Sequence, residues 1–350
     1  MLLIAGPCSA ESKAQVLRVA GEVADAGATI FRAGVWKPRT KPGGFEGVGS
    51  EALQWLAEAK EATGLRPATE IANARHLSEA IAAGIDCLWL GARTSTDPFA
   101  VQEIADAISS LPEHKRKKLT VMVKNPVNPD LELWVGAIER IQLAGIRDIV
   151  AIHRGFSSYG PHLYRNEPMW AIPFELKRRL PSLPIVCDPS HIAGQADIVA
   201  SVARHAVNMG FDGLMVEVHS DPSRALSDAS QQLTPAAFRE LLQSLPAGVR
   251  KEGSSQPDLR LQQADLSLED FRARIDLIDE QLISLLAERM KISEEIGQYK
   301  HREGMPVVQP ERYRRLMEKH AEDAASLGLS PSFARRLLSL IHEESVRRQL

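Results

Sequence analysis

The 350-residue chain has few cysteines, few aromatic residues and no long apolar run. Its three cysteines, Cys8, Cys87 and Cys187, are too few and too scattered for a disulfide framework. No apolar stretch approaches the roughly 18 residues that a membrane helix needs. The first residues lack the basic start and longer apolar core of a signal peptide, and Pro7 stands where a small cleavable residue would be. We therefore expect a cytoplasmic protein.

The chain also lacks an excess of charge of either sign. Its 42 Lys and Arg residues against 45 Asp and Glu residues give a net charge of −3. This balance argues against nucleic acid or a membrane surface as the main partner. The 44% hydrophobic and 25% charged residues are typical of a globular protein, and the length predicts more than one domain.

The composition changes along the chain. All five tryptophans lie between Trp36 and Trp170, and among the 23 glycines only Gly297, Gly304 and Gly328 lie beyond residue 265. Residues 246–257 are rich in Gly, Pro, Ser and charge and have no apolar periodicity, which is typical of a linker. We predict a first domain over 1–246, a linker over 247–264 and a helical domain over 265–350.

Short apolar runs alternate with amphipathic segments in the first domain. Eight runs are predicted as strands: Leu2–Gly6, Thr29–Ala33, Arg66–Glu70, Asp86–Gly91, Leu119–Val123, Asp148–His153, Pro184–Cys187 and Gly213–Val218. Helical patterns separate them, among them Ala14–Ala26, Ser50–Ala62, Ala74–Ala83, Phe99–Ser110, Leu131–Leu143 and Ala196–Met209. This alternation predicts an α/β fold, a (β/α)8 TIM barrel. A doubly wound open sheet would normally have fewer strands and a glycine-rich first turn.

Polar residues stand at or just after the C-terminal end of each predicted strand: Cys8, Arg32, Glu70, Arg93, Lys124, Arg154, His191 and Glu217. In a barrel these positions converge on one mouth, where barrel enzymes hold their active sites. One such residue alone would commonly be a solvated loop residue. The repetition at every strand indicates a functional site.

The expected mouth combines cations with possible metal ligands. Six cations indicate a polyanionic substrate that carries phosphate and carboxylate groups: Arg32, Lys37, Arg39, Arg93, Lys124 and Arg154. A thiol, an imidazole and two carboxylates would suit a divalent transition metal: Cys8, His191, Glu217 and Asp228. These four are far apart in the sequence, so a buried cysteine, a loop histidine and two salt-bridge partners remain the alternative.

The mouth residues occur in ordered motifs: Gly6-Pro-Cys-Ser9, Arg32-Ala-Gly-Val-Trp-Lys37-Pro-Arg39-Thr40, Gly91-Ala-Arg93, Lys124, His153-Arg-Gly155, Asp188-Pro-Ser-His191, Val216-Glu-Val-His219 and Leu226-Ser-Asp228. Across the whole barrel this set resembles the compact Iβ type of 3-deoxy-D-arabino-heptulosonate 7-phosphate (DAHP) synthase. The sister family, 3-deoxy-D-manno-octulosonate 8-phosphate (KDO8P) synthase, shares most of the motifs. That family typically has Lys-Ala-Asn-Arg-Ser where this chain has Lys37-Pro38-Arg39-Thr40.

The resemblance implies that phosphoenolpyruvate condenses with erythrose 4-phosphate and water to give DAHP and phosphate. It assigns the phosphoenolpyruvate phosphate to Arg93, Lys124 and Arg154. It assigns the phosphoenolpyruvate carboxylate to Arg32 and Lys37, and the erythrose phosphate to Arg39 and Thr40. It assigns the metal to Cys8, His191, Glu217 and Asp228, with Mn²⁺ expected and Zn²⁺, Fe²⁺ or Co²⁺ as alternatives.

Two further roles at the mouth are hypotheses. Lys37, which we expect to be crowded by other cations and to have a lowered pKa, would protonate the new alkoxide. Glu70 and Asp188 would either position water or a hydroxyl or act only structurally.

The C-terminal region is predicted to form three helices. The first begins near Ser267 and ends before Gly304, the second extends from Pro310 to Gly328, and the third begins at Ser330 and Pro331. An apolar stripe along the first helix is too long for the two shorter helices to cover: Leu268, Phe271, Ile275, Ile278, Leu282, Leu285, Ile292 and Ile296. We therefore expect a homodimer or a homotetramer.

Cations on the first helix predict a second site. Arg289 and Lys300 are three turns apart and point the same way, whereas Arg272 lies roughly 100° around the helix. One helix cannot direct all three at one pocket, but two copies in a dimer can. The pattern resembles the all-helical AroQ-class chorismate mutases, whose binding positions are filled here by Arg272, Arg289, Lys300, Arg312, Ser345 and Gln349. In that family the long helices intertwine, and the residue at the position of Arg272 enters the neighbour's site.

This second resemblance implies rearrangement of chorismate to prephenate. Lys300 and Gln349 would donate to the ether oxygen, while Arg272, Arg289 and Arg312 would hold the carboxylates. The family commonly has Glu where this chain has Tyr313 and Asp where it has Gln309, so binding of the substrate hydroxyl is left open.

Together the two resemblances predict a bifunctional enzyme of aromatic amino-acid biosynthesis. The alternatives are a DAHP synthase with a catalytically silent helical tail for dimerisation and regulation, and a KDO8P synthase barrel. Because the first strand begins at Leu2, we expect no preceding regulatory domain. Feedback would then act through docking of the helical domain, with prephenate as the expected ligand.

Overall fold

The computed structural model describes residues 1–37, 43–159, 163–245, 268–326 and 328–349. The chain divides into two compact units, Met1–Asp265 and Leu266–Leu350, which are treated separately below. The predicted linker over 247–264 lies outside the described residues. Among the described residues, no helix combines the length and apolarity that crossing a membrane requires.

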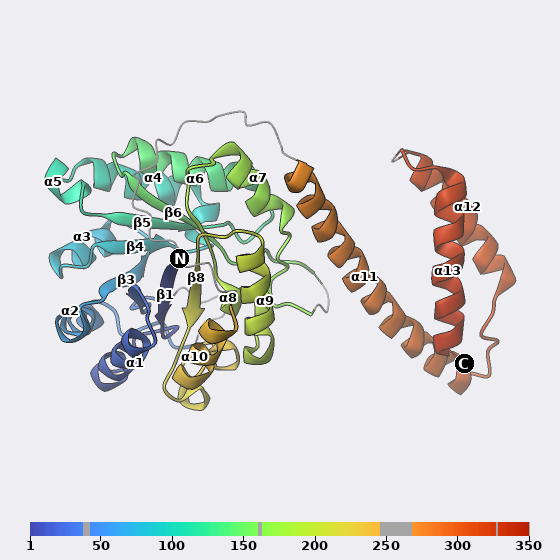
Figure 1. The fold of residues 1–350 in the computed structure, drawn as a ribbon, viewed down its shortest axis with the longest axis horizontal. Coiled ribbons are helices and arrows are strands. Elements are labelled where there is room, and N and C mark those ends of the chain that lie inside the picture. The colour runs from blue at the N-terminus through green and yellow to red at the C-terminus, as the bar shows by residue number, and fades with distance from the viewer. Residues whose placement is uncertain (38–42, 160–162, 246–267, 327, 350) are drawn as a thin grey trace. The chain divides into compact units, whose positions relative to one another are not determined.

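Eight parallel strands of the first unit close into a barrel, in which each strand pairs with the next and β8 pairs with β1 (Figure 1). The strands are β1 (Leu2–Gly6), β2 (Ile30–Arg32), β3 (Arg66–Ile71), β4 (Cys87–Leu90), β5 (Thr120–Lys124), β6 (Asp148–His153), β7 (Ile185–Cys187) and β8 (Gly213–Glu217). Apolar side chains from alternate positions form the core, among them Ile4, Trp89, Met122, Ile152 and Met215. The predicted TIM barrel is confirmed.

Helices surround the barrel and connect its strands (Figure 1). They are α1 (Lys13–Asp25), α2 (Glu51–Thr63), α3 (Ala74–Ala82), α4 (Pro98–Ser109), α5 (Glu113–Arg116), α6 (Leu131–Leu143), α7 (Ala171–Arg179), α8 (Pro189–Ala193), α9 (Ala196–Asn208) and α10 (Pro235–Ser244). Several begin at polar N-caps whose side chains accept backbone N–H bonds, as Asn73, Asp97 and Asp130 do. Side-chain caps of this kind define where a strand-to-helix loop ends.

Gly6 ends β1 next to Arg32, the last residue of β2. Its φ is +149°, and a Cβ atom built on it would lie 2.1 Å from the carbonyl oxygen of Arg32. Only glycine therefore allows both the conformation and the close approach of the two strands. This contact fixes the start of the Gly6-Pro-Cys-Ser9 segment relative to Arg32.

His153 ends β6 inside a cage of aromatic rings. The ring centroids of Trp170, Phe156, Phe211 and Trp134 lie 5.1, 5.7, 6.0 and 6.4 Å from that of the imidazole. Burial lowers the pKa of His153 to about 3, and Arg154 adds to the effect. The imidazole is therefore neutral in the folded barrel.

The second unit consists, over its described residues, of three helices: α11 (Leu268–Arg302), α12 (Pro310–Ser326) and α13 (Pro331–Gln349). Helix α13 packs against both α11 and α12. Gly297 allows the close approach of α11 and α13, because a Cβ atom there would lie 2.8 Å from the Cα of Gln349. The three predicted helices are confirmed.

Replacing Gly6 with alanine should lower the free energy of unfolding of the barrel by more than about 2 kcal/mol, because strain and backbone overlap add. All tryptophans lie in the barrel, so denaturant unfolding followed by tryptophan fluorescence measures this domain. Gly84→Ala is the matched control, since its φ is +78° but its Cβ would meet nothing within 4 Å. That variant should lose only about 1–2 kcal/mol. Equal losses in the two variants would contradict the contact.

The His153→Phe variant should flatten the pH dependence of barrel stability. In the unfolded chain the imidazole binds a proton near pH 6.5, whereas in the folded barrel it does so only near pH 3. The free energy of unfolding therefore rises with pH across this window, by up to about 1.4 kcal/mol per pH unit from this group. Between pH 6.5 and 5, the native barrel should lose stability faster than the variant. A slope that is unchanged by the substitution, as expected for the exposed His114→Gln control, would refute the assignment.

Candidate active sites

The ends of distant strands bring polar side chains to one mouth of the barrel. Arg32, Lys124 and Glu217 are the last residues of β2, β5 and β8, while Cys8 and Arg154 follow β1 and β6. Arg32, Lys124 and Glu217 are buried although they are charged. Such burial is rare for charged residues unless they are paired, which indicates a built site.

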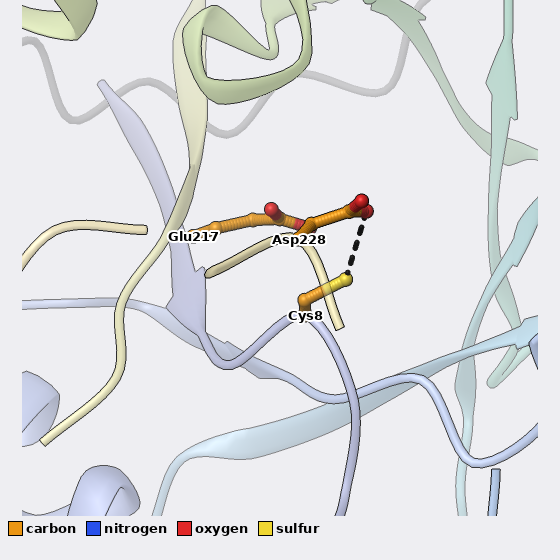
Figure 2. Close-up of side chains that lie close together, drawn as sticks. All are labelled: Cys8, Glu217 and Asp228. Carbon is orange, nitrogen blue, oxygen red and sulfur yellow. Dashed lines mark hydrogen bonds between the residues drawn. The ribbon is translucent and has the colours of Figure 1, made fainter. Parts of the chain in front are cut away.

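A thiol and two carboxylates form a compact cluster at this mouth (Figure 2). One ligand atom each from Cys8, Glu217 and Asp228 lies within 4.8 Å of the other two, and Cys8 Sγ donates to Asp228 Oδ2 at 3.3 Å. Asp228 has a φ of +45°, a left-handed conformation that is uncommon for non-glycine residues but is adopted more often by Asp than by most others. Together the three groups could hold a divalent metal ion.

The protonation of the cluster fits a metal site. Burial raises the pKa of the Cys8 thiol to about 12, and Glu217 adds to the effect against the opposing Lys37 ammonium. Burial also acts to raise the pKa of Asp228, but neighbouring cations, first of all Arg165, outweigh it and hold that pKa below its usual range. A proton thus occupies the sulfur in the free site, and a metal cation would replace it there.

His191 lies beside the cluster. Its Nε2 is 3.8 Å from Glu217 Oε1, and its Nδ1 is 2.8 Å from Asp188 Oδ2. Burial lowers the pKa of His191 despite Asp188, so the ring is neutral at pH 7, the form that binds metals. The fourth predicted ligand is therefore adjacent to the other three.

Arg32 carries unpaired donors into the mouth. Its Nη2 donates to Glu217 Oε1 at 3.0 Å, while Nε and Nη1 find no hydrogen-bond partner among the described residues. The guanidinium lies 5.1 Å from the ring of Trp89, and the Lys124 ammonium lies 5.9 Å from the same ring. Because an unpaired buried donor is costly, the free N–H groups point to an anionic ligand.

Arg154 and Arg93 extend the cationic lining. The backbone N–H of Arg154 donates to Asn125 Oδ1 at 2.7 Å, and its Nη1 donates to Asn166 Oδ1 at 2.6 Å. Burial lowers the pKa of Arg154 to about 10, which leaves it charged at neutral pH. Arg93 is exposed just before η1 (Thr94–Thr96).

The prediction of a lowered pKa for Lys37 is wrong. Burial does act to lower it and Arg32 adds to that effect, but Cys8, Glu217 and Glu70 outweigh them, so the pKa is raised. The Lys37 Nζ lies 3.0 Å from both the sulfur and the carbonyl oxygen of Cys8. The sequence shows that cations lie near Lys37, but it does not show how closely Cys8, Glu217 and Glu70 approach its amine.

Two further predicted residues, Arg39 and Thr40, lie outside the described residues. Glu70 accepts a hydrogen bond from Trp89 Nε1 at 3.0 Å. The carboxylate also lies against Gly91, where a Cβ atom would come within 2.1 Å of Glu70 Oε1. Glu70 is thus held in place by β4 and the residue after it.

Three residues that support the cluster were not predicted from the sequence. Gln231 Nε2 donates to Glu217 Oε2 at 2.7 Å, and Gln232 Oε1 accepts the backbone N–H of Cys8 at 3.0 Å. Their closeness to Asp228 in the sequence was a usable signal. Arg165 donates to Asp228 Oδ1 at 3.1 Å from a long loop after β6, and no sequence signal placed it there.

The helical unit pairs its predicted residues across α11 and α13. Arg289 donates to the hydroxyl of Ser345, and Lys300 Nζ donates to Gln349 Oε1 at 2.9 Å. Arg289 also lines an open pocket of about 300 Å³ together with Leu285, Glu288, Ile292, Ser293 and Ile296. Arg312 is exposed on α12, and the side chain of Arg272 lies outside the described residues.

Tyr313 is paired with a residue that the sequence analysis missed. Its ring lies 4.3 Å from that of His342, from centroid to centroid. Burial lowers the pKa of His342, and both Arg289 and Lys300 add to the effect. The Tyr313–His342 pair therefore lies in the field of these two cations.

The closed barrel and its polar mouth define a TIM-barrel enzyme, followed by a separate helical unit. Residues 1–248 match the DAHP synthetase I family, and the chain belongs to this family. Residues 271–350 match chorismate mutase type II. The chain is therefore a bifunctional enzyme of aromatic amino-acid biosynthesis in the shikimate pathway, with a 3-deoxy-7-phosphoheptulonate synthase domain and a chorismate mutase domain, which confirms the prediction from the motifs.

Known proteins of both sister families are similar to the barrel. The phospho-2-dehydro-3-deoxyheptonate aldolase of Thermotoga maritima is 31% identical over 243 residues, which cover 69% of this chain and 68% of that protein. A 2-dehydro-3-deoxyphosphooctonate aldolase of Nitrobacter winogradskyi is 28% identical over 265 residues, covering 70% and 86%. The crystal structure of the Thermotoga maritima enzyme superimposes with a TM-score of 0.61 at 29% identity, covering 69% of this chain and 67% of that chain.

Proposed function

We propose that the barrel mouth condenses phosphoenolpyruvate with erythrose 4-phosphate and water to give DAHP and phosphate. The observation that carries this proposal is the buried Arg32, whose free Nε and Nη1 donors lie beside the cluster of Cys8, Glu217 and Asp228. An anion-binding group and a candidate metal site are thereby adjacent. A condensation between an anionic enol ether and a polarised aldehyde needs both.

A divalent metal fits the donor set of Cys8, Glu217, Asp228 and the adjacent His191. Mn²⁺ is the expected ion, and Zn²⁺, Fe²⁺ or Co²⁺ would also accept mixed sulfur, nitrogen and oxygen ligands. When bound, the metal supplies Lewis-acid polarisation of the aldehyde oxygen.

The cations divide between the two substrates. Arg32 and Lys37 bind the phosphoenolpyruvate carboxylate, while its phosphate is held by Lys124, Arg154 and Arg93. Support comes from the hydrogen bond of the Arg154 guanidinium to Asn166, a neutral amide that leaves the positive charge available for a phosphate. Arg39 and Thr40 bind the phosphate of erythrose 4-phosphate.

Lys37 acts as the proton donor in this scheme. Carbon 3 of phosphoenolpyruvate attacks the aldehyde carbon, and Lys37 Nζ gives its proton to the alkoxide oxygen that forms. Water then adds to carbon 2, which has become electron-deficient, and the first proton of the water returns to the Lys37 amine. The remaining hydroxyl proton passes to the phosphate group as the bond between carbon 2 and the phosphate oxygen breaks, which leaves the ketone of DAHP and free phosphate. The raised pKa of Lys37 keeps the amine protonated at neutral pH, as the role requires.

The Lys37→Met variant should lower the rate of phosphate release from phosphoenolpyruvate and erythrose 4-phosphate by about 10²–10⁴-fold, because the proton donor is lost. Metal content, measured by atomic emission after gel filtration, should stay at the native level. The control Lys60→Met removes a partly exposed lysine of α2 that lies 3.9 Å from Asp86, and it should leave both values unchanged. A Lys37→Met variant that turns over at the native rate would disprove the role of this amine.

For the helical domain we propose conversion of chorismate to prephenate. Lys300 and Gln349 stabilise the ether oxygen, Ser345 assists binding, and Arg289, Arg312 and Arg272 hold the carboxylates. The pairing of Lys300 with Gln349 and the pocket beside Arg289 support this proposal. The rearrangement needs no nucleophile, so charge and hydrogen-bond donors suffice.

A homodimer through α11 is part of this proposal. Ile278, Leu282 and Leu285 are each more than half exposed on one face of the helix. Leu285 also belongs to the rim of the Arg289 pocket, so a second copy that covered this face would close the pocket. Pairing of dimers into a tetramer and inhibition of the barrel by prephenate stay predictions from the sequence.

The Lys300→Met variant should lower kcat/KM for chorismate by about 10²–10³-fold, because a donor to the ether oxygen is lost. Loss of chorismate absorbance measures the rate. Lys291→Met, on the same helix but exposed, should react at the native rate. If the native protein itself shows no mutase activity, the helical domain is the silent dimerisation module that the sequence left as an alternative.

A further inference from the structure

Asp188 is a fully buried carboxylate between β7 and α8 that the proposed condensation does not use. Its Oδ2 accepts a hydrogen bond from Lys124 Nζ at 2.8 Å and lies 2.8 Å from His191 Nδ1. Arg32 Nη1 lies 3.9 Å from the same oxygen. Asp188 Oδ2 thus contacts both Lys124, which is proposed to bind phosphate, and His191, which is proposed to bind the metal.

The second oxygen of Asp188 fixes the backbone that carries the histidine. Oδ1 accepts the N–H of His191 at 3.1 Å, so the side chain caps the short helix in which His191 lies. On the other side, Asn166 Nδ2 donates to the His191 carbonyl oxygen at 2.6 Å. The backbone N–H and carbonyl oxygen of His191 are therefore both held by neighbouring side chains.

The position of the carboxylate selects the tautomer of the ring. A carboxylate oxygen 2.8 Å from Nδ1 favours the neutral tautomer that carries its proton on Nδ1. Nε2 then keeps its lone pair, and it lies on the side of Glu217, 3.8 Å from Oε1. The lone pair is thereby presented to the cluster of Cys8, Glu217 and Asp228.

Asp188 also restricts where the ammonium group of Lys124 can lie. The amine lies beside the Trp89 ring and is almost completely buried, so its salt bridge to Asp188 defines where the ammonium sits. Without that anchor, a lysine side chain has many rotamers, and a phosphate ligand would have to order it.

We propose that Asp188 is a positioning residue that sets the metal-facing nitrogen of His191 and the ammonium of Lys124 at the same time. The inference rests on the proposed metal site and phosphate site of the barrel. It predicts that the loss of one carboxylate weakens both metal binding and phosphoenolpyruvate binding.

Asp212 provides a control carboxylate at the opposite end of β7 and β8. Asp212 Oδ2 also accepts from a lysine, Lys177 Nζ at 2.9 Å, and from a backbone N–H, that of Ile185 at 2.8 Å. It lies just before β8 and contacts no group of the mouth that is described above. The Asp212 side chain is 40% exposed, so Asp212→Asn tests whether the loss of any lysine-paired carboxylate at these strands weakens metal binding.

The experiment titrates the metal-free full-length protein with Co²⁺ and follows the sulfur-to-cobalt absorption band, which needs no turnover. The Asp188→Asn variant should bind Co²⁺ about 10–100-fold more weakly than the native protein. Its KM for phosphoenolpyruvate should rise as well. Asp212→Asn should match the native protein in both measurements.

The outcomes separate this inference from the function on which it rests. If the native protein gives no sulfur-to-cobalt band, the metal site itself is refuted. If the native band appears and Asp188→Asn binds within about twofold of native, or if Asp212→Asn weakens binding equally, the positioning role is refuted.

Asp188→Glu covers the case in which the asparagine variant does not fold. It keeps the charge for Lys124 but moves the carboxylate by one methylene, so its Co²⁺ affinity should fall while its thermal unfolding remains cooperative. Native affinity in this variant would also overturn the proposal.

Discussion

The barrel mouth depends on the mutual compensation of buried charges. Arg32 pairs with Glu217 at 3.0 Å and Lys124 with Asp188 at 2.8 Å, and all four side chains are almost completely shielded from solvent. Each unpaired ion would cost several kcal/mol to bury. The four residues come from β2, β5, the end of β7 and β8, so only the closed barrel brings the pairs together.

The buried charges of the mouth are not fully compensated, so groups that could bind an anion and a metal cation remain. Arg32 keeps two donors without partners among the described residues, and the Cys8 thiol holds a proton that a cation could replace. The helical domain works differently, because Arg289 and Lys300 are paired with the neutral side chains of Ser345 and Gln349. Neutral partners leave the full positive charge for a dianionic substrate. The cations of the two proposed anion-binding sites are therefore compensated in two different ways.

The sequence was sufficient for the fold and for most of the mouth. Alternation of apolar runs with helical patterns predicts the barrel, and a residue at a strand end must then face the mouth, as Arg32 and Glu217 do. What it could not predict are interactions between strands and loops that are distant in the chain. The raised pKa of Lys37 depends on its distance to Cys8, and Arg165 reaches Asp228 from a long loop. His342 was missed because its significance comes from packing against Tyr313.

The central claim is that the mouth performs a metal-dependent condensation with the four-carbon sugar phosphate. The most direct test measures phosphate release from phosphoenolpyruvate with erythrose 4-phosphate or arabinose 5-phosphate, before and after chelation, alongside the mutase rate. We expect release with erythrose 4-phosphate but not with arabinose 5-phosphate, its loss on chelation and its return with Mn²⁺, while chelation should leave the mutase rate unchanged. Equal release with arabinose 5-phosphate, or full release after complete removal of metal, would contradict the claim.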